Sequence, residues 1–369
     1  MKVLFLEPFF GGSHKDFALG FKNNSCHEVS LVTLPDRFWK WRMRGAALYF
    51  ADKVKNLSDY DAVFTTDMLN LADLQSLNGI KIPPVLMYFH ENQLSYPLAP
   101  KQQRDSNLSF INIVSAAAAN KVLFNSKFHF SDFINAATRL LKHMPDARPE
   151  WMIEQIRQKT KIVYPGCQFE TGVIDFKKKA AKKPLIIWNH RWDHDKNFKV
   201  FFDVLSSLKE KNIPFSLALM GERFKKFPDI FKRAKEKFKS ETVVFGYVES
   251  KEKYISWLKK GAIVVSSAIQ ENFGISVIEA VRYGCIPLLP DRLSYPELIP
   301  DDLHHKVLYK TKKDFEEKLE DMIINYPEHL PIQKRLSEHM EQFSWEIMVK
   351  QYDDVLGKMG EEQTLFNYQ

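Results

Sequence analysis

Short apolar runs alternate with segments of helical spacing through the first half of the chain. The runs have the length of buried strands and lie at residues 3–6, 28–34, 62–65, 85–90, 122–125 and 161–164. Apolar residues at helical spacing lie between several of them, at residues 17–21, 112–120 and 128–141. This alternation predicts a doubly wound parallel sheet, and hence an α/β fold.

The second half of the chain repeats the pattern. Strand-like runs and helical segments again alternate, the runs at 185–188, 216–220, 242–245, 262–265 and 286–289 and the helices at 198–210, 227–239 and 251–259. Residues 177–184 form a lysine-rich run that ends in proline, which is typical of a solvated linker. We therefore predict two Rossmann-like domains, at residues 1–176 and 184–344, and a last amphipathic helix within residues 345–369.

The composition is that of a folded protein. With 369 residues, of which 45% are apolar and 27% charged, both halves can build a core. No stretch approaches the ~20 apolar residues of a membrane span, and the first residues read as a strand rather than a signal peptide. The three cysteines lack metal-ligand spacing and are interpreted as free thiols of a reducing cytoplasm. A net charge of +7 is mild for a nucleic-acid binder but permits a polyanionic partner.

Polar residues collect where strands of the first half end, which is where ligands bind in doubly wound sheets. Two such groups are Gly11, Gly12, Ser13 and His14, and His90, Glu91, Asn92 and Gln93. The glycine pair would let a phosphate or a sugar approach the backbone, although a plain turn explains it as well. His90 is either a structural histidine or part of a site.

Residues 38–44 interleave aromatic side chains with cations, in the sequence FWKWRMR. Such a segment can stack on nucleobases and contact phosphates, through Lys40, Trp41, Arg42 and Arg44. It can equally be the start of an amphipathic helix that packs its tryptophans inside. Arg148 belongs to a second basic stretch, which reads as an ordered loop.

Residues 264–290 read as strand, loop, helix and strand, a unit typical of a parallel sheet. A carboxylate, Glu279, lies in the helix, and the loop before it holds Glu271, Asn272, Phe273 and Gly274. Amides at a helix N-terminus favour anions, and carboxylates accept hydrogen bonds from hydroxyls. The stretch therefore suits a diphosphate with sugar and ribose hydroxyls beside it, although a surface loop before an ordinary helix fits too.

The loop that follows residues 185–188 carries two cations, Arg191 and Lys196. Asp193 and Asp195 in the same loop formally spell an Asp-x-Asp metal motif. The neighbouring cations make a divalent ion redundant, so we predict no metal. Two more strands of this half end in candidate walls for a nucleotide base, Gly221 and Tyr247.

These motifs resemble those of known glycosyltransferases. Two glutamates separated by seven residues, with Phe-Gly between them, resemble the donor-site motif of retaining glycosyltransferases of the GT-B fold, in the glycogen-synthase-like family. Further segments resemble the tRNA-queuosine α-mannosyltransferases, and the resemblance covers roughly residues 1–300. The segments are EPFFGGSHK, LPDRFWKWRMRGAALYF, YFHENQLSYP, QQRD, FNSKFHFSDF and HMPDARP.

The resemblance implies an architecture and an activity. The two Rossmann-like domains would face each other across a cleft, the first binding the acceptor and the second the nucleotide sugar, and the last helix would pack back on the first. A retaining reaction would move mannose from GDP-mannose to the cyclopentene-diol of queuosine, at the anticodon position of tRNA-Asp. The implied partners are tRNA carrying queuosine and a nucleotide sugar. No metal or other cofactor and no stable membrane association are implied, and the location would be cytoplasmic.

The same resemblance implies roles for single residues. Arg191 and Lys196 would hold the donor diphosphate and stabilise the charge that develops on it. Glu279 would accept hydrogen bonds from ribose hydroxyls and Glu271 from mannose hydroxyls, while His90 would hydrogen-bond the sugar. Other expected donor-binding residues are Gly12, Gly221, Tyr247, Asn272, Phe273, Gly274 and Ile275. Expected acceptor-binding residues are Ser13, His14, Lys40, Trp41, Arg42, Arg44, Glu91, Asn92, Gln93 and Arg148.

Three alternatives stay open at this point. A transferase of the same fold could act on a lipid or a polysaccharide. A tRNA-binding module could retain a donor site as a relic, and a sugar-phosphate epimerase on this fold would need no acceptor.

Overall fold

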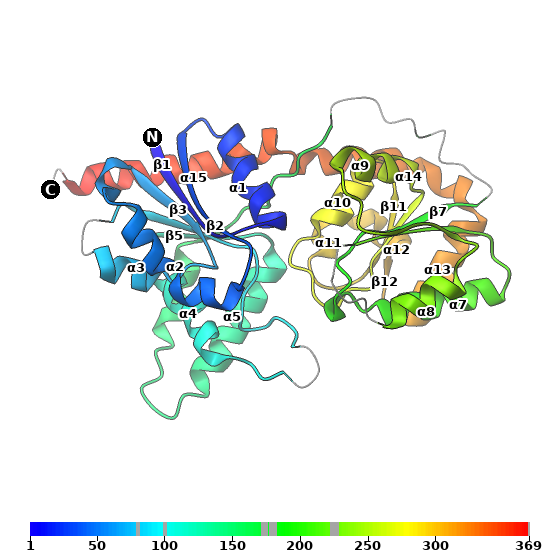
Figure 1. Cartoon of the computed structure of the whole chain (residues 1–369), viewed down its shortest axis with the longest axis horizontal. Coiled ribbons are helices and arrows are strands. Elements are labelled where there is room, and N and C mark those ends of the chain that lie inside the picture. Colours follow the sequence, from blue (N-terminus) through cyan, green and yellow to red (C-terminus); the bar gives the residue numbers. More distant parts are fainter. Residues whose placement is uncertain (79–81, 99–101, 171–175, 177–182, 222–228, 368–369) are drawn as a thin grey trace. The chain divides into compact units, whose positions relative to one another are not determined.

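The computed structural model describes the chain except residues 79–81, 99–101, 171–175, 177–182, 222–228 and 368–369 (Figure 1). The described residues form two compact units, one made of Met1–Gln168 with Phe343–Gln369 and the other of Phe169–Gln342. Most of the linker that the sequence predicts at residues 177–184 lies outside the described residues.

The first unit is built on six parallel strands in the order β2-β1-β3-β4-β5-β6. Their bounds are β1 Lys2–Phe10, β2 Glu28–Pro35, β3 Ala62–Thr66, β4 Val85–Phe89, β5 Lys121–Phe124 and β6 Thr160–Ile162. Neighbouring residues of β1 enter two different cores, Leu4 and Leu6 one of them and Val3 and Phe5 the other. A strand that is buried on both faces needs a continuous apolar run, which is why the sequence reveals it.

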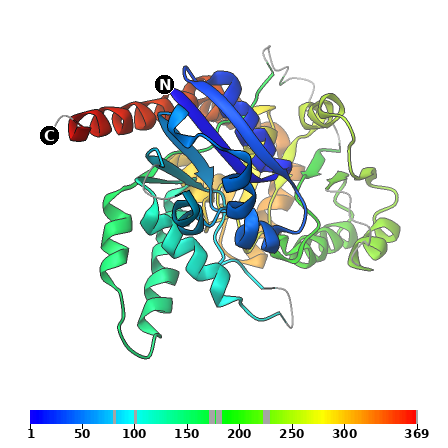
Figure 2. The ribbon, with the colours of Figure 1, turned by 60° about the vertical axis from the view of Figure 1, so that its left-hand side comes forward.

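Helices cover both faces of this sheet. They are α1 Gly12–Asn24, α2 Trp39–Lys53, α3 Leu71–Asn78, α4 Ser106–Ala118, α5 Lys127–Lys142, α6 Trp151–Gln158 and α15 Trp345–Asn367. Helix α15 comes from the end of the chain and lies along the sheet in both views (Figures 1 and 2). Its apolar positions follow the helical period and share one core with Phe5, Phe17 and Phe64 of the first half. They are Trp345, Met348, Val349, Tyr352, Val355, Leu356 and Met359.

The second unit also has six parallel strands, in the order β12-β11-β10-β7-β8-β9. Their bounds are β7 Leu185–Trp188, β8 Ser216–Met220, β9 Thr242–Gly246, β10 Ile263–Val265, β11 Ile286–Pro290 and β12 Leu308–Tyr309. The sequence predicts the first five, whereas β12 has two residues and carries no periodic signal. The helices are α7 Phe198–Glu210, α8 Asp229–Lys237, α9 Lys251–Lys260, α10 Ile275–Arg282, α11 Tyr295–Leu298, α12 His304–Val307, α13 Lys312–Ile324 and α14 Tyr326–His339. Among the helices of the described residues, none has the length and apolarity that a bilayer crossing requires.

Each sheet has one point where the strand order reverses. In the first unit β1 and β3 are neighbours, and the chain proceeds outward from them in opposite directions, to β2 and to β4. In the second unit β7 and β10 are neighbours and lead outward to β8 and β11. The loops that leave neighbouring strands in opposite directions open a crevice at their carboxyl ends, where ligands of such sheets bind. These two points are therefore where a site is expected.

Candidate active site

The reversal point of the second sheet gathers charged residues from the loops after β7 and β10. Lys196 ends the 3₁₀ turn His194–Lys196, and its side chain is buried. Its ammonium donates to the carbonyl of Gln270, at 3.0 Å, and to Glu271 Oε2, at 3.2 Å. The carboxylate of Asp195 lies 3.0 Å from the same ammonium. The loop after β10 is thus fastened to the loop after β7 through one buried lysine.

Opposite charges keep this lysine protonated. Burial lowers the pKa of Lys196, but Glu271 and Asp195 raise it by more, so the net shift is upward. The guanidinium of Arg191 lies 3.8 Å from the Asp195 oxygen that Lys196 contacts, Oδ2, and the side chain of Arg191 is 47% exposed. Arg191 is therefore the cation that a ligand can reach directly, whereas Lys196 acts from beneath. The sequence offered Asp195 only as half of a metal motif, and the structure shows its carboxylate between two cations.

Glu279 joins the same region through a second chain of contacts. It lies on α10, is buried, and forms an ion pair with Lys251 of α9. Its Oε2 accepts from the hydroxyl of Tyr254, at 3.1 Å, and that hydroxyl accepts from Asn189 Nδ2, at 2.9 Å. Asn189 directly follows β7, so the two carboxylates of the motif are both tied to the loop that carries Arg191. The sequence analysis did not select Lys251 or Tyr254.

The loop between the two glutamates has a fixed shape. Gly274 caps α10 with a φ of +103°, in the left-handed region that glycine tolerates best. The hydroxyl of Ser294 donates to the carbonyls of Glu271 and Phe273, at 3.2 and 2.9 Å. Asn272 Oδ1 accepts from Gln270 Nε2, at 2.8 Å. The first residue of α10, Ile275, is half-buried, and its amide stands at the helix N-terminus, which favours anions.

Two residues that the sequence offers as base walls lie at the ends of neighbouring strands. Gly221 follows β8 and lies against the indole of Trp192. Tyr247 follows β9, and 55% of its surface is exposed. An exposed ring at the carboxyl end of a strand is available to a planar ligand, but its partner stays a prediction.

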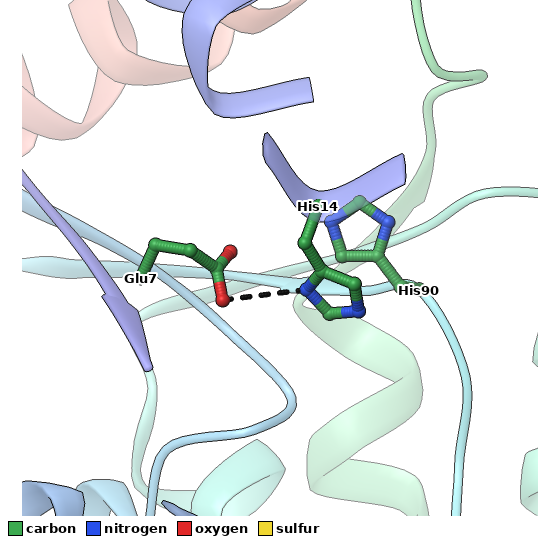
Figure 3. A group of neighbouring side chains, drawn as sticks. All are labelled: Glu7, His14 and His90. Carbon is green, nitrogen blue, oxygen red and sulfur yellow. Dashed lines mark ion pairs between the residues drawn. The ribbon is translucent and has the colours of Figure 1, made fainter. Parts of the chain in front are cut away.

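The reversal point of the first sheet holds two acids and two histidines, of which Figure 3 shows Glu7, His14 and His90. Glu7 lies fully buried within β1, and its Oε1 is 3.3 Å from His14 Nδ1 on α1. The imidazole rings of His14 and His90 are in contact, with centroids 4.1 Å apart and planes inclined by 40°. Asp67, which directly follows β3, accepts from the backbone N–H of His90 at 2.8 Å. Two buried acids thus position the histidines. Glu7 contacts the ring of His14, and Asp67 accepts from the backbone of His90.

The two neighbouring rings differ in charge. Burial lowers the pKa of His14, but Glu7, with smaller contributions from Asp67 and Glu91, raises it by more, and the net pKa is about 9. Burial and the nearby charge of His14 hold the pKa of His90 well below 6.5. Near neutral pH, His14 is therefore an imidazolium that can bind an anion. His90 is a neutral imidazole that can hydrogen-bond a hydroxyl. Burial also raises the pKa of the Asp67 carboxyl, to about 8.

Some of these side chains could also serve as metal ligands. Glu7, His14 and His90 offer donor atoms within 4.8 Å of one another, and so do Cys26, His27 and Asp353 elsewhere in the first unit. A metal at the first group would have to displace the proton that Glu7 stabilises on His14. The charges present therefore fit the ion pair of Figure 3 better than a metal centre.

The remaining polar residues near His90 shape their own loop. Asn92 is buried, and its Oδ1 accepts from the backbone of Leu94 and Ser95, both at 3.0 Å. The backbone N–H of Gln93 donates to Asn112 Oδ1, at 2.8 Å, and its side chain donates to Glu91. Three further predicted residues border the ring pair: Gly12, with a φ of +50°, the exposed Ser13 and the half-buried Glu91.

The aromatic and basic segment after β2 is exposed. Helix α2 does begin there, at Trp39, but Trp41 is 72% exposed, so its ring is not packed inside the helix. Lys40 is exposed, and Arg42 Nε donates to the carbonyl of Pro35 at 3.2 Å. Arg44 forms an ion pair with Asp105, the residue that caps α4, and Arg148 is exposed on its loop. Arg44 therefore also helps to fix α2 against α4.

The sequence analysis did not select four residues that position the side chains at the two reversal points: Glu7 and Asp67 in the first unit, and Lys251 and Tyr254 in the second. Asp67 follows a predicted strand, so the rule that selected His90 could have found it. Glu7 lies inside a strand that we ended four residues too early. Lys251 and Tyr254 lie on α9 and reach Glu279 only because α9 packs against α10, which the sequence pattern does not show.

Comparisons with known proteins agree over both halves of the chain. Residues 2–167 match the family profile of the tRNA-queuosine alpha-mannosyltransferase N-terminal domain, and residues 173–342 match that of glycosyl transferases group 1. A tRNA-queuosine alpha-mannosyltransferase of Drosophila melanogaster is 36% identical over 324 residues, which are 84% of this chain and 85% of the fly protein.

Two solved structures illustrate the fold. Sucrose-phosphate synthase from Thermosynechococcus elongatus matches over all of both chains, with a TM-score of 0.72 and 12% identity. Anabaena HepE, solved in complex with UDP and glucose, matches over 97% of this chain and 99% of its own, with a TM-score of 0.68 and 15% identity. At such identities only the fold is shared. Together with the two parallel six-stranded sheets, it confirms the predicted α/β class and the GT-B fold.

Proposed function

The chain belongs to the tRNA-queuosine alpha-mannosyltransferase family and is a glycosyltransferase, and from this premise we propose its donor, its acceptor atom and the roles of its residues. The donor is GDP-mannose. The acceptor is a hydroxyl of the cyclopentene-diol of queuosine at the anticodon position of tRNA-Asp, and the anomeric configuration is retained. Family membership speaks against the lipid and polysaccharide acceptors, the relic binding module and the epimerase considered above.

The observation that carries the donor half is the network of Arg191, Asp195, Lys196 and Glu271 at the reversal point of the second sheet. Cleavage of the glycosidic bond puts charge on the departing diphosphate. A fixed cation stabilises that charge more in the transition state than before it. Arg191, being half exposed, contacts the diphosphate, and Lys196 adds its field from beneath while it orients Glu271.

Hydroxyls of the donor meet the two glutamates. Glu271 accepts from mannose hydroxyls, in an orientation that Lys196 sets, and Glu279 accepts from ribose hydroxyls. The backbone at 273–275 adds amide donors to the diphosphate. Lys251 and Tyr254 already occupy both oxygens of Glu279, so they fix where its remaining lone pairs point.

The first unit supplies the acceptor side. His90, as a neutral imidazole, hydrogen-bonds the sugar that is transferred. The residues around His14 and at 90–93 bind the queuosine nucleotide of the tRNA. We assign no nucleophile, in contrast to retaining hydrolases. The acceptor oxygen attacks the anomeric carbon on the face that the diphosphate leaves. Its proton passes to the departing phosphate oxygen, so charges and atoms balance without a protein base.

The tRNA lies across the first unit and touches Lys40, Arg42 and Arg148, which the net charge of +7 favours. A cytoplasmic location is part of the same proposal. Among the described residues no two cysteines form a disulfide, as is usual in a reducing compartment.

Mass analysis of the nucleosides from tRNA tests the assignment. Queuosine-containing tRNA is incubated with the protein and each of a panel of nucleotide sugars. We expect queuosine to gain one hexose with GDP-mannose alone, and nothing with tRNA that lacks queuosine. A gain from another donor would overturn the mannose assignment, and no gain from any donor would overturn the proposed reaction.

A further inference from the structure

The first unit presents an apolar face to solvent on α2. Residues 35–41 are all exposed, and the rings of Phe38 and Trp41 are 70% and 72% exposed. Leu48, further along α2, is 64% exposed. Phe38, Trp41, Gly45 and Leu48 are three or four residues apart in turn, so they lie on one side of the helix. We call these four residues the α2 face. Large apolar side chains gathered at the surface mark interaction sites.

The backbone of this segment is strained. Phe38 precedes the helix with φ 57° and ψ 47°, a left-handed conformation that a bulky residue rarely adopts. Its carbonyl accepts from the N–H of Trp41 and of Arg42, at 2.8 and 3.1 Å, so the conformation is held in place. Strained residues of this kind collect at ligand-binding sites.

Gly45 stands in the interior of α2, where alanine would favour the helix. Apart from its chain neighbours and the backbone of its own helix, a Cβ at Gly45 would meet no atom of the described residues within 4 Å, and the φ of Gly45 is not positive. Neither packing nor backbone geometry within the chain calls for glycine here. What glycine provides is bare backbone between Trp41 and Leu48, against which a flat partner can press.

Position and charge indicate what that partner is. Pro35 pairs with Phe10 at the carboxyl end of β1, the sheet edge that also carries His14. Asp36, the one acid among residues 35–41, packs against Gly11, while Arg37 and Lys40 are exposed. The segment therefore combines rings and cations beside the proposed acceptor site, and this combination suits single-stranded nucleic acid.

We propose that the α2 face is a stacking platform for unpaired bases of the anticodon loop, next to the nucleotide that accepts the sugar. Phe38 and Trp41 stack on bases, the backbone at Gly45 lets the strand lie close, and Arg37 and Lys40 contact its phosphates. This inference rests on the proposed function, because it takes a tRNA as the acceptor. It adds the contacts by which the anticodon loop is held in its unstacked form.

Trp41→Ala and Phe38→Ala test the platform in the full-length protein. Loss of one stacked base should weaken binding of a queuosine-containing anticodon stem-loop roughly 5- to 150-fold. KM for tRNA should rise alike, while kcat at saturation and the affinity for GDP stay unchanged. Trp41→Tyr, which keeps an aromatic ring, should retain most of the stem-loop affinity that Trp41→Ala loses. Leu77→Ala, at a 51% exposed position of α3, is the matched control and should change nothing.

Gly45→Ala separates a binding role from a structural one. It should favour the helix and raise thermal stability, yet weaken stem-loop binding. Unchanged RNA affinity in Trp41→Ala and Phe38→Ala, with transfer to tRNA intact, would overturn the platform and leave the proposed function standing. If these variants instead lost self-association or binding to anionic vesicles, the face would belong to a second copy or to a membrane. Absence of transfer by the unmodified protein would count against the proposed function alone.

Discussion

The substitution Glu7→Gln tests whether a buried carboxylate keeps His14 charged. Glutamine retains the size of the side chain, and its oxygen can still accept from the backbone N–H of Phe9 and the hydroxyl of Thr66. It removes the negative charge that lies 3.3 Å from His14 Nδ1. Burial lowers the pKa of His14, and Glu7 raises it more than the other nearby acids, Asp67 and Glu91, so without Glu7 that pKa should fall well below about 9.

The magnitude follows from the shift. The pKa of His14 is raised from 6.5 to about 9, and one unit corresponds to about 1.4 kcal/mol, so the charged ring contributes ~3 kcal/mol to folding. A raised pKa stabilises the fold fully below the pKa of the unfolded chain, and that contribution is lost as the pH rises through the folded value. The free energy of unfolding of the native protein should therefore exceed that of Glu7→Gln most near pH ~6. The difference between the two free energies should shrink between about pH 6.5 and 9.5.

Two measurements check this. In protein labelled with ¹³C-histidine, the His14 resonance is assigned by its loss in His14→Gln. It should titrate near pH 9 in the native protein and at a clearly lower pH in Glu7→Gln. Urea unfolding at several pH values should show that the stability difference between the native protein and Glu7→Gln shrinks with pH. In a His14→Gln background, the effect of Glu7→Gln on stability should no longer depend on pH. A His14 resonance that titrates near its ordinary value in the native protein, or a stability difference that ignores pH, would refute the reasoning.

Three further outcomes are expected. Arg191→Ala and Glu271→Gln should each lower kcat roughly 10²- to 10³-fold with an unchanged far-UV circular dichroism spectrum, and near-native turnover would contradict their roles. Tyr254→Phe removes the hydroxyl between Asn189 and Glu279, so the Kd of GDP measured by calorimetry should rise about 2- to 10-fold, while an unchanged Kd would place Glu279 outside the donor site. The tRNA affinity should fall with salt, with a log–log slope of about −2 for three single-strand phosphate contacts, and a salt-independent affinity would count against the tRNA surface.

Strands were the most predictable part of the fold, because burial on both faces leaves a continuous apolar run. The run of β1 is interrupted by Glu7 and Pro8, so we ended it at Leu6 although the strand continues to Phe10. That error hid Glu7, which in sequence looks like a strand terminator. In the structure it is a buried partner of His14.

Candidate site residues were predictable where they lie in the loop that leaves the carboxyl end of a strand, as Arg191, Lys196, Glu271 and His90 do. Residues that approach these side chains from a neighbouring helix, such as Lys251 and Tyr254 of α9, were not predictable. Tyr254 touches Glu279 only because α9 and α10 pack together, and periodicity shows which face of a helix is buried but not what it meets. Likewise, the amphipathic pattern of α15 predicted which of its faces is buried, but not what that face contacts. Its expected position on the first unit came only from the family resemblance.

Because α15 completes the first unit, synthesis order constrains how this protein can fold. The ribosome must make residues 169–342 between the sheet and the helix that covers it, which takes roughly 10 to 30 s. During that interval α15 does not yet cover Phe5, Phe64 and Tyr88. Because this apolar surface is exposed, the nascent chain is prone to aggregate and is a candidate for chaperone binding. A fragment that stops before Trp345 should stay in that state permanently, so the first unit is best expressed alone with α15 joined to it by a short linker.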